Sequence, residues 1–97
     1  MKIQLKGRHF TREIWLIGKK LSPGPSQKVC NHSPDGFSWG YGGSGPAQLA
    51  LAVLLELYDR DFALAHHQGF KFMYIERLRQ ADFETEIDMT EFEFSVA

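Results

Sequence analysis

The sequence has little cysteine and no long apolar run. Cys30 is the only cysteine, so an internal disulfide is excluded and a reducing compartment is the natural setting. The richest apolar stretch, residues 47–57, is far shorter than the about 20 residues that a membrane-spanning helix requires. Residues 1–6 alternate polar and apolar side chains and contain no uninterrupted signal-peptide core. We therefore expect a cytoplasmic protein without a membrane partner.

An excess of charge of one sign is also missing. The chain carries a net charge of -1, which gives no general attraction to nucleic acid, so we expect no nucleic-acid partner. The charges are distributed unevenly, because cations dominate residues 1–28 and carboxylates dominate residues 80–97. We expect the two ends of the chain to pair as neighbouring strands of one sheet. A basic groove or an acidic surface that meets a partner is the alternative.

The 97 residues, 43% hydrophobic and 24% charged, are typical of one globular domain, here residues 1–97. Alternation of apolar and polar side chains predicts half-exposed strands over residues 2–7 and 83–88. The run IWLI predicts a strand over residues 12–18 that is covered on both faces. Aromatic residues alternate with small ones over residues 37–41 and predict a strand with one aromatic face. Prolines and a glycine predict a loop over residues 22–26.

The helices follow the aromatic stretch. Residues 46–58 are almost entirely apolar, which predicts a helix buried in the middle of the domain, with Pro46 in its first turn. Asp59 or Asp61 is suited to cap a second helix. Gly69 leaves residues 70–76 open to two interpretations, a continued helix or a strand. The sequence thus predicts an α+β fold with a single small antiparallel sheet of about four strands, packed on the buried central helix and a second helix.

The most informative stretch, GFSWGYGGSGPAQLALA, runs from Gly36 to Ala52. Its glycines have the spacing G-x-G-x-x-G between an expected strand and an expected helix, where backbone amides can meet a phosphate. A P-loop is excluded because Pro46 and Ala47 follow the last glycine in place of Lys and Ser or Thr. A dinucleotide fold is not supported, because no further parallel βα units follow. A structural turn into the buried helix is the competing interpretation.

A ligand at this turn needs more than amides. A helix N-terminus contributes about 0.3–2 kcal/mol to an anion, whereas micromolar affinity needs about 8 kcal/mol. Trp39 and Tyr41 are candidates to stack a base, and Arg8 is a candidate to hold a phosphate if the N-terminal hairpin lies nearby. The predicted ligand-binding residues come from three short stretches of the chain: Arg8, Trp39, Tyr41, Gly42, Gly43, Ser44 and Gly45.

Other reactive side chains give weaker signals. Ser44 stands near the position of a nucleophile on a strand-to-helix turn, but the final glycine of that motif is missing and a helix-capping hydroxyl is the better interpretation. Cys30 and His32 suggest a thiol nucleophile or half of a metal site. His66 and His67 are adjacent, diverge on a helix and are expected to be surface or packed imidazoles. No catalytic residue and no metal ligand is therefore predicted.

The block GFSWGYGGSGPAQLALAVLL, preceded by Asn31-His32-Ser33-Pro34 and followed by Phe70-Lys71, resembles a family of small domains of unknown function from bacteria, phages and other mobile elements. The resemblance covers the chain from Arg8 to about Leu78. It implies no reaction, ligand or catalytic residue. Residues after Leu78 fit the family pattern poorly, and Phe72 and Phe83 stand where the pattern has tryptophan.

Two functions follow as hypotheses. The first is a small non-catalytic binding module that needs no cofactor and holds a phosphate-bearing small molecule or nucleotide at the glycine turn. The second is a protein-interaction or inhibitor protein of the anti-defence type, which uses its aromatic surface or its acidic C-terminal strand. The carboxylates of that strand are Glu84, Glu86 and Asp88. Enzyme activity is expected less than either.

Overall fold

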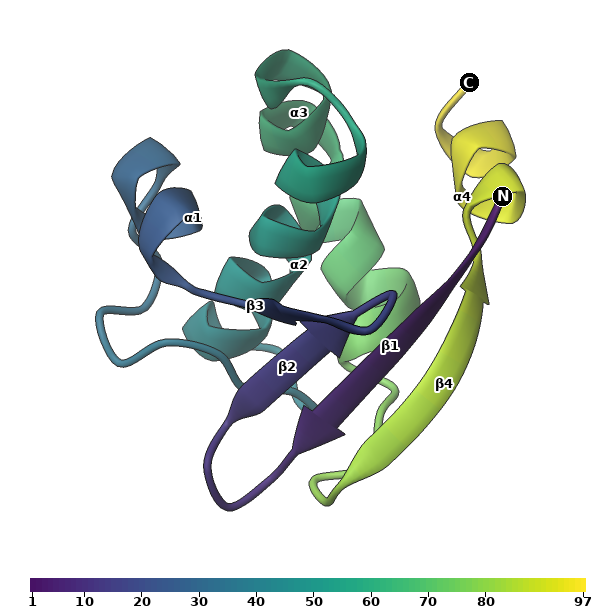
Figure 1. Cartoon of the computed structure of the whole chain (residues 1–97). Helices are drawn as coiled ribbons and strands as arrows, with labels where there is room; N and C mark the ends of the chain where they lie inside the picture. The colour runs from purple at the N-terminus through teal and green to yellow at the C-terminus, as the bar shows by residue number, and fades with distance from the viewer.

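The computed structural model describes residues 1–97 and contains four strands, four α-helices and one π-helical turn. The strands are β1 (Lys2–Arg8), β2 (Glu13–Leu16), β3 (Lys19–Leu21) and β4 (Phe83–Asp88). The helical segments are α1 (Gly24–Val29), α2 (Ser44–Leu57), α3 (Arg60–Phe70), the π-helical turn η1 (Lys71–Ile75) and α4 (Met89–Val96). Figure 1 shows the helices gathered on one side of the sheet. The predicted α+β fold is confirmed.

The two ends of the chain meet in the sheet. All neighbouring strands are antiparallel in the order β3-β2-β1-β4, so β1 lies inside the sheet and β4 forms one edge. The register places Lys2 opposite Asp88 and Lys6 opposite Glu84. Opposite charges on facing residues support this pairing. The predicted pairing of the basic and acidic ends is therefore confirmed.

Each strand has one buried face. Ile3 and Leu5 of β1 point into the core, while the charged residues between them are exposed. The prediction that residues 12–18 are covered on both faces is wrong, because Trp15 lies half-buried on the open face of the sheet. Ile17 has left β2, with a positive φ of 52° and 59% of its surface exposed. It forms the turn into β3.

The central helix α2 is buried as predicted. Every residue from Gly45 to Leu54 is buried, and Pro46 lies in the first turn. The helix α3 begins after Asp59, whose side chain accepts a hydrogen bond from the amide of Phe62 at 2.8 Å. Residues 70–76 do not form a strand, because the backbone continues from α3 into η1. None of the helices combines the length and the apolar character needed to cross a bilayer.

Two predictions about local structure are wrong, and one helix was not predicted. Residues 37–41 form no strand and bend at Gly40 and Tyr41, and β3 supplies the remaining strand of the sheet. The expected loop at residues 22–26 gives way to α1, because Pro25 falls in the first helical turn, where no amide donor is needed. The chain after β4 forms α4, capped by Asp88, whose carboxylate accepts from the amide of Thr90 at 3.0 Å.

Candidate functional site

The aromatic segment, residues 37–41, is held by side chains rather than by strand pairing. Trp39 is fully buried, and its indole nitrogen donates to the carbonyl of Ala81 at 3.0 Å. The amide of Gly40 donates to the carbonyl of Ile75 at 3.0 Å. The side chain of Gln80 donates to the carbonyl of Gly40 at 3.2 Å. The segment is thereby fastened to the stretch of chain between η1 and β4.

The surroundings of Trp39 seal it from solvent. The ring of Phe83 meets it edge-on, with ring centroids 5.0 Å apart, and His9 lies 6.1 Å away in a similar geometry. The guanidinium of Arg12 lies 5.7 Å from its centroid. A fully buried indole cannot stack a base. The prediction that Trp39 binds a ligand is therefore wrong.

Tyr41 and the glycines after it pack closely on one another. Tyr41 is 45% exposed, and its hydroxyl lies 2.7 Å from that of Ser38. A Cβ on Gly43 would lie 2.7 Å from Cε2 of Tyr41, and a Cβ on Gly45 would overlap the hydroxyl of Ser38. At Gly45 close packing against Ser38, including its backbone nitrogen at 3.2 Å, requires glycine, whereas a side chain at Gly43 would have to displace the half-exposed ring of Tyr41. This supports the structural interpretation of the turn.

The amides of residues 42–45 are unpaired within the chain, but Gly45 is buried, so only residues 42–44 present theirs at the surface. None of them donates to a backbone carbonyl or to a side chain. However, a Cβ on Gly42 would lie 3.0 Å from Oε1 of Glu76, so a carboxylate stands beside the turn and repels an anion. Lys71 lies 3.7 Å from Oε2 of this carboxylate. None of the five main surface pockets is lined by residues 39–45, so none of them adjoins the glycine turn.

Arg8 and Ser44 do not join a common site. The guanidinium of Arg8 lies over Trp15, 5.9 Å from its ring centroid, on the open face of the sheet. Ser44 is exposed as the first residue of α2, and Gly43 occupies the N-cap without a side-chain hydrogen bond. The expectation that the hydroxyl of Ser44 caps the helix is therefore wrong. No histidine forms a hydrogen bond with Ser44.

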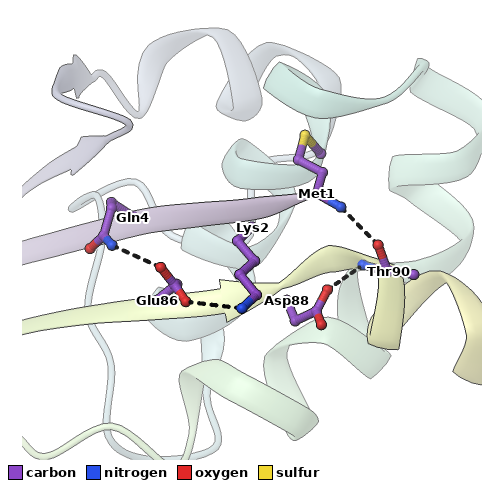
Figure 2. Close-up of polar contacts among 6 residues, drawn as sticks. All are labelled: Met1, Lys2, Gln4, Glu86, Asp88 and Thr90. Atoms are coloured by element: carbon purple, nitrogen blue, oxygen red, sulfur yellow. Dashed lines mark hydrogen bonds and ion pairs between the residues drawn. The ribbon is translucent and has the colours of Figure 1, made fainter.

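The three predicted carboxylates of β4 have different surroundings. Glu86 lies between Lys2, at 3.8 Å, and the side-chain amide of Gln4, at 3.3 Å, as Figure 2 shows. Asp88 caps α4. Glu84 is exposed opposite Lys6 and forms no ion pair within 4.0 Å. Glu84 is therefore the carboxylate that is most open to a partner.

The edge of the sheet continues into α4. Three hydrogen bonds fasten this helix to the helical layer. The hydroxyl of Tyr58 donates to Glu93 at 2.6 Å, that of Tyr74 donates to Glu91 at 3.4 Å, and that of Ser95 donates to the sulfur of Met73 at 3.6 Å. Burial, with the neighbouring carboxylate, raises the pKa of both tyrosines. Phe94 nevertheless stays 85% exposed. A hollow of about 520 Å³ adjoins it, lined by Met73, Asp88, Thr90, Glu91, Phe94 and Ser95.

A pair of histidines joins two segments that lie far apart in the sequence. The Nε2 atoms of His32 and His67 lie 2.9 Å apart. Sequence reasoning grouped His32 with Cys30 and His67 with His66, because those residues are neighbours in the chain. No sequence signal identifies the pair, since its members meet only when α3 packs beside the loop after α1. Nowhere do three or more metal-binding side chains form a cluster.

The chain belongs to a family of unknown function, DUF6166, which it matches over residues 5–96. The match extends past Leu78, so β4 and α4 are part of the family domain, and the expected boundary at Leu78 is corrected. No curated protein and no solved structure matches the chain. The comparisons therefore establish the family and assign no activity.

Proposed function

We propose that the protein is a non-catalytic interaction module that binds an extended, basic segment of a partner protein along β4. The single observation that carries this proposal is that β4 is an edge strand whose exposed side chains are carboxylates. An inhibitor of a host protein, of the kind that mobile elements encode, is one role that such a module fills. The partner is proposed to be cytoplasmic, in keeping with the lone thiol of Cys30.

The backbone of β4 supports strand addition. One side of β4 pairs with β1 from Phe83 to Asp88, and its outer side donates to and accepts from no other part of the chain. In Figure 1, β4 lies at the outer edge of the sheet. An unpaired edge offers a row of amides and carbonyls to an incoming strand.

The charges of β4 select against a second copy of the same strand. Glu84 and Glu86 are both exposed, and two such strands side by side would bring like charges together. Lysine or arginine at alternate positions of an incoming strand would face these carboxylates. The hollow beside Met73 and Phe94, at the end of β4 where Asp88 lies, would accept one apolar side chain of the same segment.

A synthetic peptide of alternating lysine and valine tests this proposal. Amide chemical shifts in a titration are expected to change at residues 83–88 and to change little elsewhere. Reversal of the two exposed charges, in the variant Glu84→Lys with Glu86→Lys, is expected to weaken binding about tenfold or more.

Glu56→Lys with Asp61→Lys is the matched control, because it makes the same change of net charge on two exposed carboxylates of α2 and α3, away from β4. This variant is expected to bind the peptide like the unmodified protein. Equal weakening by the control and by the β4 variant would reduce the effect to net charge. Shifts that avoid residues 83–88 would reject β4 as the binding edge.

The phosphate-ligand hypothesis is a second candidate, favoured by one observation, the free amides of residues 42–44 beside the half-exposed Tyr41. Thermal unfolding with inorganic phosphate and a panel of nucleotides tests it, because a ligand at about 100 times its dissociation constant stabilises the fold by about 2.7 kcal/mol. Tyr41→Ala is expected to remove the shift given by a nucleotide and to leave that given by phosphate. An absence of any shift rejects this candidate.

A further inference from the structure

His32 and His67 come from separate segments and share one hydrogen bond. His32 lies in the loop that follows α1, and His67 lies near the end of α3. Their Nε2 atoms are 2.9 Å apart, and the ring centroids are 5.0 Å apart. With nitrogens this close and centroids this far apart, the rings point toward each other end to end. This is the arrangement of an N–H···N hydrogen bond.

The hydrogen-bonding partners of His67 fix the direction of this bond. His67 is buried, with 6% of its surface exposed. Its Nδ1 lies 3.0 Å from the carbonyls of both Ala63 and Leu64. Carbonyls accept only, so Nδ1 of His67 carries a proton and Nε2 of the neutral ring accepts. The Nε2 of His32 is therefore the donor, and its Nδ1 is left to take up a further proton.

We propose that His32 and His67 form an acid-sensitive latch that holds the loop of residues 31–36 against α3 at neutral pH and releases it in mild acid. One added proton on Nδ1 of His32 leaves the hydrogen bond intact. A second added proton goes to Nε2 of His67 and removes the acceptor. Two imidazolium rings then face each other across the distance of a hydrogen bond, and the rings separate.

The neighbouring groups make protonation unfavourable while the latch is closed. Burial lowers the pKa of His32, and the positive charges of a protonated His67 and of Lys71 lower it further. Lys71 comes from η1, where Glu76 partly offsets its charge at 3.7 Å. From α2, the residue that faces His32 is Gln48, which does not titrate. From α1, the titratable group nearest in the chain is the thiol of Cys30, the residue that caps the end of this helix.

The direction of the pH effect follows from this lowered pKa. When the chain is unfolded or the loop is released, His32 takes up a proton at a pH of about 6.5. In the closed latch it does so at a lower pH. The histidine pair therefore contributes fully to stability above about pH 6.5. This contribution is lost as the pH falls through the lowered pKa of His32, and the hydrogen bond itself breaks only when the second proton removes the acceptor on His67. Release is therefore expected on the acid side of neutrality.

The loop has a second attachment that does not titrate. The side-chain oxygen of Gln48 accepts from the amides of His32 at 2.7 Å and Ser33 at 2.9 Å. Its side-chain nitrogen donates to the carbonyl of Cys30 at 3.1 Å. A third attachment comes from α1, where the side-chain nitrogen of Gln27 donates to the carbonyls of Ser33 at 2.8 Å and Pro34 at 3.3 Å. Release of the histidine pair thus loosens the loop at one of its three attachments. Cys30, partly packed against the core, becomes more accessible when the loop moves.

The reaction rate of the Cys30 thiol tests the latch. The rate with a pyridyl disulfide is measured from about pH 7.5 to about pH 5 and divided at each pH by the rate of the urea-unfolded protein, which removes the intrinsic pH dependence of the thiol. The normalised rate is expected to rise about tenfold over this range, which corresponds to a loss of about 1.4 kcal/mol in the stabilisation of the closed loop. His32→Gln is expected to show a raised rate that does not depend on pH.

His66→Gln is the matched control, because it removes a neighbouring histidine of α3 that has no part in the pair. It is expected to keep the pH dependence of the unmodified protein. A normalised rate that stays flat in the unmodified protein, or a rise that persists in His32→Gln, would overturn the latch.

Nitrogen-15 chemical shifts of the imidazoles give a measurement that needs no variant. At neutral pH they are expected to show a proton on Nδ1 of His67 and on Nε2 of His32. The opposite tautomers would refute the assignment. Stabilisation by Zn²⁺ at neutral pH that vanishes in His32→Gln would also refute it, because the two nitrogens would then hold a metal ion in place of a proton.

Discussion

The strand β4 and the aromatic segment carry the same alternation of side chains and are held in different ways. In β4, Phe83, Thr85 and Ile87 alternate with carboxylates, and every residue from 83 to 88 faces a partner in β1. Residues 37–41 make one backbone hydrogen bond, from Gly40 to Ile75. Alternation thus reports which side chains are buried, and it does not report whether the backbone has a strand to pair with.

The difference between the two regions has a physical cause in the backbone. Gly40 has a φ of 86°, which interrupts an extended chain and which most residues avoid. Both edges of β1 and of β2 are already occupied by other strands. The aromatic segment instead buries Phe37 and Trp39 in the core, and Phe83 of β4 packs on Trp39. The two regions therefore meet through their aromatic rings.

The largest effect is expected when the anchor of the aromatic segment is removed. Trp39→Ala deletes a fully buried side chain and its hydrogen bond to Ala81. This is expected to cost about 3–5 kcal/mol, or at least about 12 °C in the melting temperature of a domain of this size. The sequence places Tyr41 on the same face as Trp39, but its side chain is 45% exposed. Tyr41→Ala is therefore expected to cost less than about 1.5 kcal/mol. Urea unfolding measures both, and equal losses would contradict the distinction.

A second, smaller effect tests the backbone of Gly40. In Gly40→Ala the positive φ costs about 1–2 kcal/mol, and the new Cβ would lie 2.8 Å from the carbonyl oxygen of Leu78. We expect a total loss of about 2–4 kcal/mol, because a backbone contact of this kind must be relieved by movement. Gly18→Ala is the matched control, with a φ of 77° and no atom within 4 Å. A loss in Gly40→Ala no larger than that in Gly18→Ala would show that the close contact has no cost.

Elements whose sequence carries two agreeing signals were predictable. Strands β1 and β4 show both alternation and complementary charge, and α2 shows a long apolar run after Pro46. The short β3 and α1 carry no such signal, because their formation depends on the turn at Ile17 and on packing against α2. The helix α4 was hidden because its acidic sequence continues the composition of β4. Its start depends on the cap at Asp88.

The candidate sites were less predictable than the fold. The sequence identified Glu84 and Glu86 as surface carboxylates, and the structure adds that they lie on an edge strand. The exposure of Trp39 was predicted wrongly, because a tryptophan on an alternating stretch has the same pattern whether its face meets solvent or the core. The contact of His32 with His67 spans two loops and a helix, so only the folded chain brings these rings together.

The smallest effect is expected at the polar positions of the two alternating regions. Glu86→Gln keeps a side chain that can accept from Gln4 and removes the attraction to Lys2, a pair whose side chains are 51% and 65% exposed. Exposed ion pairs contribute about 0–1 kcal/mol, so we expect a loss below about 0.5 kcal/mol that shrinks as salt is added.

Ser38 occupies the corresponding polar position of the aromatic segment, where its hydroxyl meets that of Tyr41 and packs against Gly45. Ser38→Ala is expected to cost about 0.5–1.5 kcal/mol at any salt concentration. Chemical unfolding at low and high salt compares the two variants. If Ser38→Ala were as mild and as salt-dependent as Glu86→Gln, the polar positions of the aromatic segment would be solvated like those of a strand, and the packing described for this turn would be wrong.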